Sequence, residues 1–168
     1  MNTSQLDDLV PERSKAVGYM ERTRKYYRAL GYKQDYSWAQ NNDIPFIKPT
    51  KPLSEMTVAV ITTTSPAGTT KADTPAVWSA DATLVPSEMY TDNLAWDKET
   101  THTNDTGSYI PLTAMHSMVA EGELGGVARR YHGVPTEYSH RQTLTNDAPE
   151  LLDRIIEDKA DAVLLVAL

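Results

Sequence analysis

Two stretches of the chain are almost entirely apolar and short enough to be strands. Residues 56–64, MTVAVITTT, are rich in β-branched side chains, and residues 162–168, AVLLVAL, contain no polar side chain. Neither stretch alternates with polar residues, so each predicts a strand that is covered on both faces. A shorter strand is predicted at residues 82–85.

Three other segments place apolar residues at the i, i+3, i+4 spacing of a helix. Residues 11–31 and 111–122 each begin with proline and end with glycine, the residues favoured at those ends. The third helix is predicted to start at Asn146 or Asp147, either of which can cap it.

Strands and helices in this order predict an α/β fold with an open, mostly parallel sheet of flavodoxin-like or Rossmann-like type. We expect two parts. Residues 1–45 form a basic helix and a proline-rich extended arm, and residues 46–168 form the front part of an α/β domain.

The last apolar stretch bears on function, because open α/β sheets bind ligands beyond the carboxyl ends of their strands. A strand as apolar as residues 162–168 needs neighbouring strands on both sides and helices on both faces. We therefore expect the sheet to be incomplete within these 168 residues. Either a partner chain or a continuation of the gene product would finish it.

Composition narrows the class of protein. The chain has 16 basic and 23 acidic residues, a net charge of -7 that argues against non-specific nucleic-acid binding. It has no cysteine, so these residues hold no thiol nucleophile and no disulfide. No apolar run approaches the roughly 20 residues that span a bilayer, and the N-terminus lacks a signal-peptide pattern. We expect a cytoplasmic protein that binds neither nucleic acid nor membrane.

Positive charge is concentrated between Glu12 and Lys33, where seven basic residues accompany two acidic ones. A basic amphipathic helix can lie on a membrane surface or on an acidic partner. A solvated helix face is the favoured interpretation, because tyrosines alternate with the charges where a membrane helix would present a broad apolar surface.

A polar loop supplies the first candidate site, in which Asp97, Glu99, His102, Asn104 and Asp105 lie within nine residues. A histidine with carboxylates can bind a divalent metal or form an acid–base pair. The same residue types also make ordinary turns, because Asn and Asp bond to their own backbone. The spacing lacks the tight pattern of zinc sites, so no metal is predicted.

A second loop and the end of the first strand supply other candidates. Arg129 and Arg130 could hold a carboxylate substrate in a bidentate fork, or the loop could be a surface turn. The threonines that end the first strand lie at the edge expected to bind a ligand, although threonine is also a common strand residue. The candidate pocket residues from these segments are Thr63, Thr64, His132 and Gly133.

Three stretches together carry a family resemblance. They are KPTKPLSEMTVAVITTTS, DTGSYIPLTAMHSMVAEGELGGVARRYHG and APELLDRIIEDKADAVLLVAL. Their order and spacing over residues 46–168 resemble the B-type selenoprotein subunits of the glycine, sarcosine, betaine and D-proline reductases. The basic helix lies outside this pattern.

The resemblance implies a selenocysteine, or a cysteine in its place, directly after the strand DAVLLVAL, with another cysteine close behind. Because UGA encodes selenocysteine, a gene read without recoding would end there, and we expect the catalytic residue just after Leu168. The implied reaction is reductive cleavage of a carbon–nitrogen bond in a small amino-acid derivative, by a selenolate that a low pKa keeps ionised. The family works with a pyruvoyl-bearing partner subunit. The matching loops would place His102, Asp105 or His132 in the pocket as proton donors or orienting groups.

Three functions follow as expectations. The first is a reductase subunit, inactive alone, that associates with other reductase subunits or with itself. The second is a non-enzymatic α/β binding or assembly subunit completed by a partner chain. This subunit would form a defined oligomer, whereas an incomplete domain would aggregate or bind hydrophobic dyes. The third is a metal-binding or small-molecule-binding protein that uses the loop at residues 97–105.

Overall fold

The chain divides into two compact units, Met1–Ile44 and Pro45–Leu168. The computed structural model describes residues 18–35, 40–45, 47–71, 73–92, 94, 99–136 and 139–168. In the first unit, helix α1 (Tyr19–Ala29) is followed by Gly31, whose φ of 87° matches the predicted glycine stop. The predicted start of this helix, at residue 11, lies outside the described residues.

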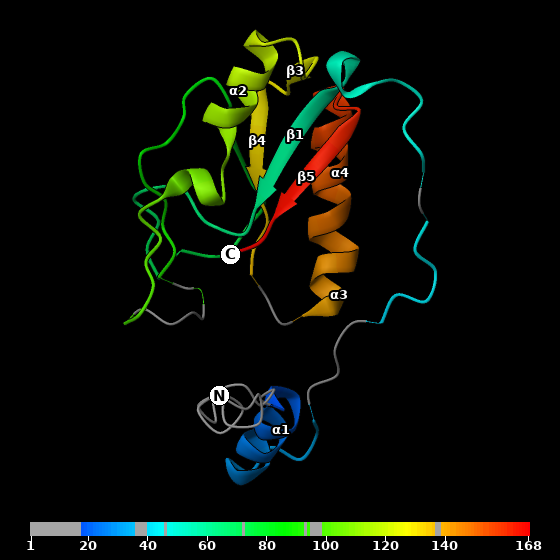
Figure 1. The fold of residues 1–168 in the computed structure, drawn as a ribbon. Helices are drawn as coiled ribbons and strands as arrows, with labels where there is room; N and C mark the ends of the chain where they lie inside the picture. Colours follow the sequence, from blue (N-terminus) through cyan, green and yellow to red (C-terminus); the bar gives the residue numbers. More distant parts are fainter. Residues whose placement is uncertain are drawn as a thin grey trace, which may run out of the picture. The chain divides into compact units, whose positions relative to one another are not determined.

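The second unit is built on a sheet with its longest strand at the centre (Figure 1). Its strands are β1 (Thr57–Thr62), β2 (Trp78–Asp81), β3 (Gly126–Val127), β4 (Arg130–Gly133) and β5 (Ala162–Val166). β3 and then β4 pair in parallel with one edge of β1, and β2 runs antiparallel outside β4. Val58 pairs with both Val127 and Ala162, so β5 lies along the opposite edge of β1. The sheet is open and mostly parallel, which confirms the predicted α/β fold.

Helices α2 (Leu112–Ala120) and α4 (Ala148–Glu157) cover opposite faces of the sheet (Figure 1). Successive side chains of a strand point to opposite faces. Val60 therefore belongs to the core beneath α2, and Ile61 to the smaller core beneath α4. Both side chains are buried. The prediction of a strand covered on both faces within residues 56–64 is therefore confirmed for β1.

The strand predicted at residues 82–85 is wrong, because β2 ends at Asp81 and a turn follows. The carboxylate of Asp81 accepts hydrogen bonds from the backbone N–H of Thr83 at 2.8 Å and from its hydroxyl at 2.7 Å. An aspartate that binds the backbone two residues ahead favours a turn over a strand.

The third helical segment also begins earlier than predicted. Ser139 accepts a hydrogen bond from the backbone N–H of Gln142 and caps α3 (His140–Gln142). The helix continues through the π-helical turn η6 (Thr143–Asp147) into α4, and Asp147 makes no side-chain capping bond. The capping prediction at residues 146 and 147 is therefore wrong.

β5 lies at an edge of the sheet in this structure. It pairs with β1 along its whole length, and no other described strand pairs with it. Leu164 is 40% exposed and Leu165 is 73% exposed. The two neighbours and two covering layers predicted for this strand are thus only partly present among the described residues.

Trp78 of β2 contacts both β4 and the segment that follows β1. Its indole Nε1–H donates to the carbonyl of Thr64 at 3.1 Å, and its ring meets Tyr131 edge to face at 5.4 Å. The ring also lies over Gly133, where a Cβ would come within 2.0 Å of Nε1. Only glycine fits at that position without moving the indole.

We expect Gly133→Ala to lower the free energy of unfolding by about 1–3 kcal/mol, because it overpacks the Trp78 ring. Gly126→Ala is the matched control, since its Cβ would meet no atom closer than 3.7 Å. Urea denaturation of both variants measures the difference. Equal losses would contradict the packing described here.

Candidate functional site

The carboxyl ends of β1, β4 and β5 meet at one edge of the sheet (Figure 1). The Thr63 hydroxyl accepts a hydrogen bond from the N–H of Leu168 at 2.9 Å and lies 3.3 Å from its carbonyl oxygen. The Thr136 hydroxyl donates to the Thr63 carbonyl at 3.4 Å. These contacts join the segments that follow the three strands.

A cleft of about 610 Å³ opens at this edge. Its walls come from the turn after β1, the start of β2 and the segment after β4. The volume falls within the range of small-molecule sites, roughly 300–1,000 Å³, and the position is where open α/β sheets bind ligands. Polar lining residues are Ser65, Thr69, Thr70, Lys71, Asp73, Thr74, Tyr90 and Asp92.

The turn after β1 is held in place at both ends. Ser65 and Tyr90 exchange two backbone hydrogen bonds of 3.0 and 2.9 Å, which bring the Tyr90 segment to the cleft. Further along, the Asp73 carboxylate accepts from the backbone N–H of Thr70 at 2.6 Å and from its hydroxyl at 3.0 Å. Lys71 is the one cation among the described residues that line the cleft.

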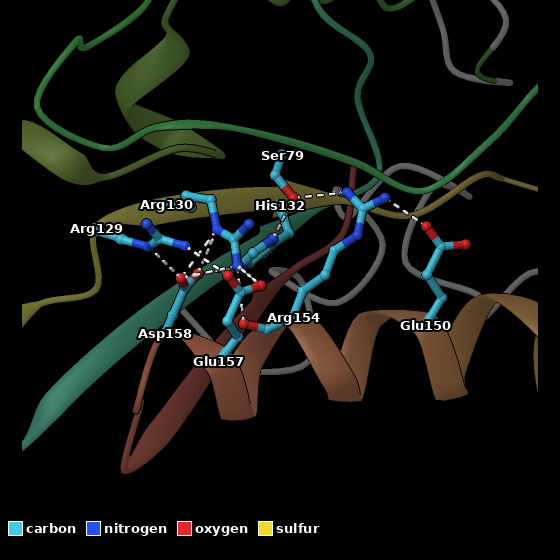
Figure 2. A network of polar contacts seen from close by, with 8 residues as sticks. All are labelled: Ser79, Arg129, Arg130, His132, Glu150, Arg154, Glu157 and Asp158. Atoms are coloured by element: carbon cyan, nitrogen blue, oxygen red, sulfur yellow. Dashed lines mark hydrogen bonds and ion pairs between the residues drawn. The ribbon is translucent and has the colours of Figure 1, made fainter.

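A polar network lies between β2, β4 and α4 (Figure 2). His132 is completely buried, and its Nδ1 lies 2.8 Å from the Ser79 hydroxyl. Arg154 donates to the same hydroxyl oxygen at 2.7 Å. The Ser79 hydroxyl can therefore donate to Nδ1, which assigns the imidazole proton to Nε2.

Nε2 of His132 faces Asp158, with 3.2 Å between Nε2 and Oδ2. The contact is close but poorly directed, because Nε2 makes no hydrogen bond of normal geometry. Asp158 instead accepts hydrogen bonds of 2.8 Å from Nε of Arg129 and 2.9 Å from Nε of Arg130. Both arginines also bind Glu157.

Burial and these arginines set the charges of the network. Burial raises the pKa of Asp158, but hydrogen bonds from Arg130 and Arg129 outweigh it, so the net pKa lies below its ordinary value. Burial lowers the pKa of His132, the charges of Arg130 and Arg154 lower it further, and Asp158 opposes them without reversing the direction. At neutral pH Asp158 is ionised and His132 is neutral.

The candidates from the strand ends lie beside the cleft, but each is in contact with another part of the protein. Thr63 and Thr64 directly precede Ser65 of the lining, and the Thr64 carbonyl binds Trp78. His132 and Gly133 directly precede Val134 of the lining. The His132 ring belongs to the network, and Gly133 lies beneath Trp78.

Arg129 and Arg130 do not form a fork for a substrate carboxylate. Their guanidinium groups bind Asp158 and Glu157 of the same chain. The carboxylate chemistry expected of them is present, but it stabilises the junction between β4 and the end of α4.

None of residues 99–105 of the polar loop lines the cleft, although the Thr103 hydroxyl lies 2.9 Å from that of Thr91, between the lining residues Tyr90 and Asp92. His102 is exposed, and its Nδ1 lies 3.4 Å from the backbone N–H of Asn104. Asp105 accepts a hydrogen bond of 3.1 Å from the N–H of Gly107 and caps the short helix η5 (Thr106–Ser108). Asp97 lies outside the described residues. Within the described part of the chain, no three His, Asp or Glu residues are grouped so as to hold a metal ion.

Several site residues were missed from the sequence. Lys71 carried a usable signal, because its loop follows β1 at the expected edge of the sheet. Tyr90 carried none, since only the pairing with Ser65 brings it to the cleft. Ser79 and Arg154 meet across 75 residues of sequence, which no local pattern indicates.

Comparison with known proteins finds no relative. No family model, curated protein or solved structure matches this chain. Among the helices that the structure describes, none combines the length and apolar character needed to cross a membrane.

We expect Asp158→Asn to lower the free energy of unfolding by about 1–3 kcal/mol, because it removes the buried carboxylate that accepts charged hydrogen bonds from Arg129 and Arg130, while both partly exposed arginines keep Glu157. Glu157→Gln removes a carboxylate that is 60% exposed and binds the same arginines, so it should cost less than about 1 kcal/mol. Guanidinium denaturation at neutral pH compares the two variants. A loss of similar size in both would show that burial of Asp158 is unimportant.

Proposed function

We propose that this chain is the B-type subunit of an amino-acid reductase that cleaves a carbon–nitrogen bond reductively. The single observation that carries the proposal is the place of the cleft. The resemblance puts the redox residue directly after the strand that is β5, and β5 leads to Thr63 beside the cleft. A nucleophile in that segment would approach a ligand in the cleft from the sheet edge.

The polar lining suits a small amino-acid derivative. Lys71 is the one cation among the described lining residues, so it can bind the substrate carboxylate. Arg129 and Arg130 cannot take this role, because they are bound to Asp158 and Glu157. Asp92 also lines the cleft, and its negatively charged carboxylate can face the amino group of the substrate. Charge-assisted contacts of this kind are about twice as strong as neutral hydrogen bonds.

The selenolate or thiolate of the redox residue would form a bond to the α-carbon as the carbon–nitrogen bond breaks and the amine leaves. A two-electron reductant outside these residues would then cleave the carbon–selenium or carbon–sulfur bond. The described residues bind and orient the substrate, and no cysteine among the 168 residues can take the nucleophile's place. The subunit alone is therefore expected to be inactive and to need the pyruvoyl-bearing partner of the family. A cytoplasmic location stays a prediction.

A second candidate function is that of a non-enzymatic assembly subunit whose sheet is completed by a partner chain. The observation in its favour is the edge strand β5, where Leu165 is 73% exposed. A defined oligomer that binds none of the reductase substrates would favour this function over the first.

Calorimetric titration with glycine, sarcosine, betaine and D-proline tests the cleft. We expect binding of at least one compound, weakened about tenfold or more in Lys71→Met, which is a loss of about 1.4 kcal/mol. Lys48→Met, at an exposed lysine outside the cleft lining, should change the affinity less than about twofold. No binding of any of the four, or equal effects of both substitutions, would contradict the proposal.

The nucleotide sequence after the Leu168 codon tests the reductase proposal independently. We expect UGA or a cysteine codon there, followed within a few codons by a second cysteine. A UAA or UAG triplet, or a continuation without cysteine, would contradict it.

A further inference from the structure

The buried network around His132 adjoins the cleft without lining it. Ser79 follows Trp78 of the cleft wall in β2, and His132 precedes Gly133 and the lining residue Val134 in β4. Ser79 and His132 are paired directly across the two strands. Whatever separates this pair also disturbs the wall of the cleft.

The charges that surround His132 balance only while the imidazole is neutral (Figure 2). Neighbouring β1 contributes no titratable side chain, and the one acid of β2, Asp81, is bound to Thr83 in the turn. The other charged groups are three carboxylates and three guanidinium groups: Glu150, Glu157, Asp158, Arg129, Arg130 and Arg154. A protonated His132 would add a buried positive charge to this neutral set.

The hydrogen bonds of the intact network also disfavour protonation of His132. Protonation places a hydrogen on Nδ1, where the ring now accepts from Ser79. Ser79 would then receive donors from both His132 and Arg154, and its own hydrogen would need a new acceptor. Asp158 offers little compensation, because two arginines already share it and Nε2 is poorly directed toward it.

We propose that the Ser79–His132–Asp158 network is a pH-sensitive brace that holds the β2–β4 wall of the cleft, and that protonation of His132 releases it. Trp78 and Val134, which both lie on the cleft side of the Ser79–His132 pair, would then lose their fixed positions. The inference requires no particular ligand and stands whether or not the chain is a reductase subunit.

The sign of the pH dependence follows from the lowered pKa of His132. In the unfolded chain the imidazole takes up a proton near its ordinary value of about 6.5, whereas the folded chain does so only at lower pH. The unfolded state therefore binds more protons between these two values. Stability is full above about pH 6.5 and falls as the pH drops from there through the folded pKa.

Amide hydrogen exchange of the full chain tests the brace directly. After correction for intrinsic rates, we expect protection of the β2 and β4 amides to fall about tenfold or more between about pH 7.5 and pH 5. Amides of α2, on the other face of the sheet, should change less than about twofold and serve as the internal reference. Equal changes in all three elements would overturn the inference.

A variant and a spectroscopic measurement separate this role from a merely structural one. His132→Gln should remove the pH dependence of β2 and β4 exchange, whereas His102→Gln, at an exposed loop histidine, should retain it. If His132→Gln fails to fold, nitrogen NMR of the unaltered chain decides. We expect a neutral His132 with its proton on Nε2 at pH 7 and protonation below the ordinary pKa. Protonation at or above that value would contradict the brace.

Discussion

Burial of β1 on both faces and along both edges constrains everything else in the second unit. Its side chains from Val58 to Thr62 are buried and feed both hydrophobic cores. Each fully buried Val or Ile contributes about 1.5–3 kcal/mol, so a shift of register that exposed them would be costly. The pairing of β1 with β4 and β5 thus fixes where those strands end, and the cleft lies at that edge.

The elements that the sequence located correctly are those with a continuous apolar run or a regular apolar stripe, although the burial predicted for β5 is only partly present. β1 lies within its predicted stretch, and β5 lies at Ala162–Val166. α2 ends before Gly122, whose φ of 76° suits the predicted stop. β2 was misplaced because only tertiary pairing with β4 makes a strand of Trp78–Asp81. The cap at Ser139 was missed because helical turns without a strong apolar stripe precede α4.

The sequence predicted where the candidate site lies better than it predicted which residues form it. The edge of the sheet followed from strand direction, and Thr63 was placed there from the sequence, whereas Gly133 was a candidate in a loop that the structure brings to the same edge. The partners of the charged groups did not follow, because Asp158 meets Arg129 across 29 residues and Arg154 meets Ser79 across 75. Arg129 and Arg130 bind carboxylates of the protein itself, so the fork for a substrate carboxylate that the sequence suggested is not formed.

The central claim is that ligands bind at the carboxyl edge of the sheet, between the turn after β1 and the segment after β4. Backbone amide shifts during titration with betaine or glycine test it most directly. Changes centred on the lining segments, residues 65–71, 73–78, 90–92 and 134, are the predicted result. Changes centred on residues 99–105 would place the site in the polar loop and contradict the account.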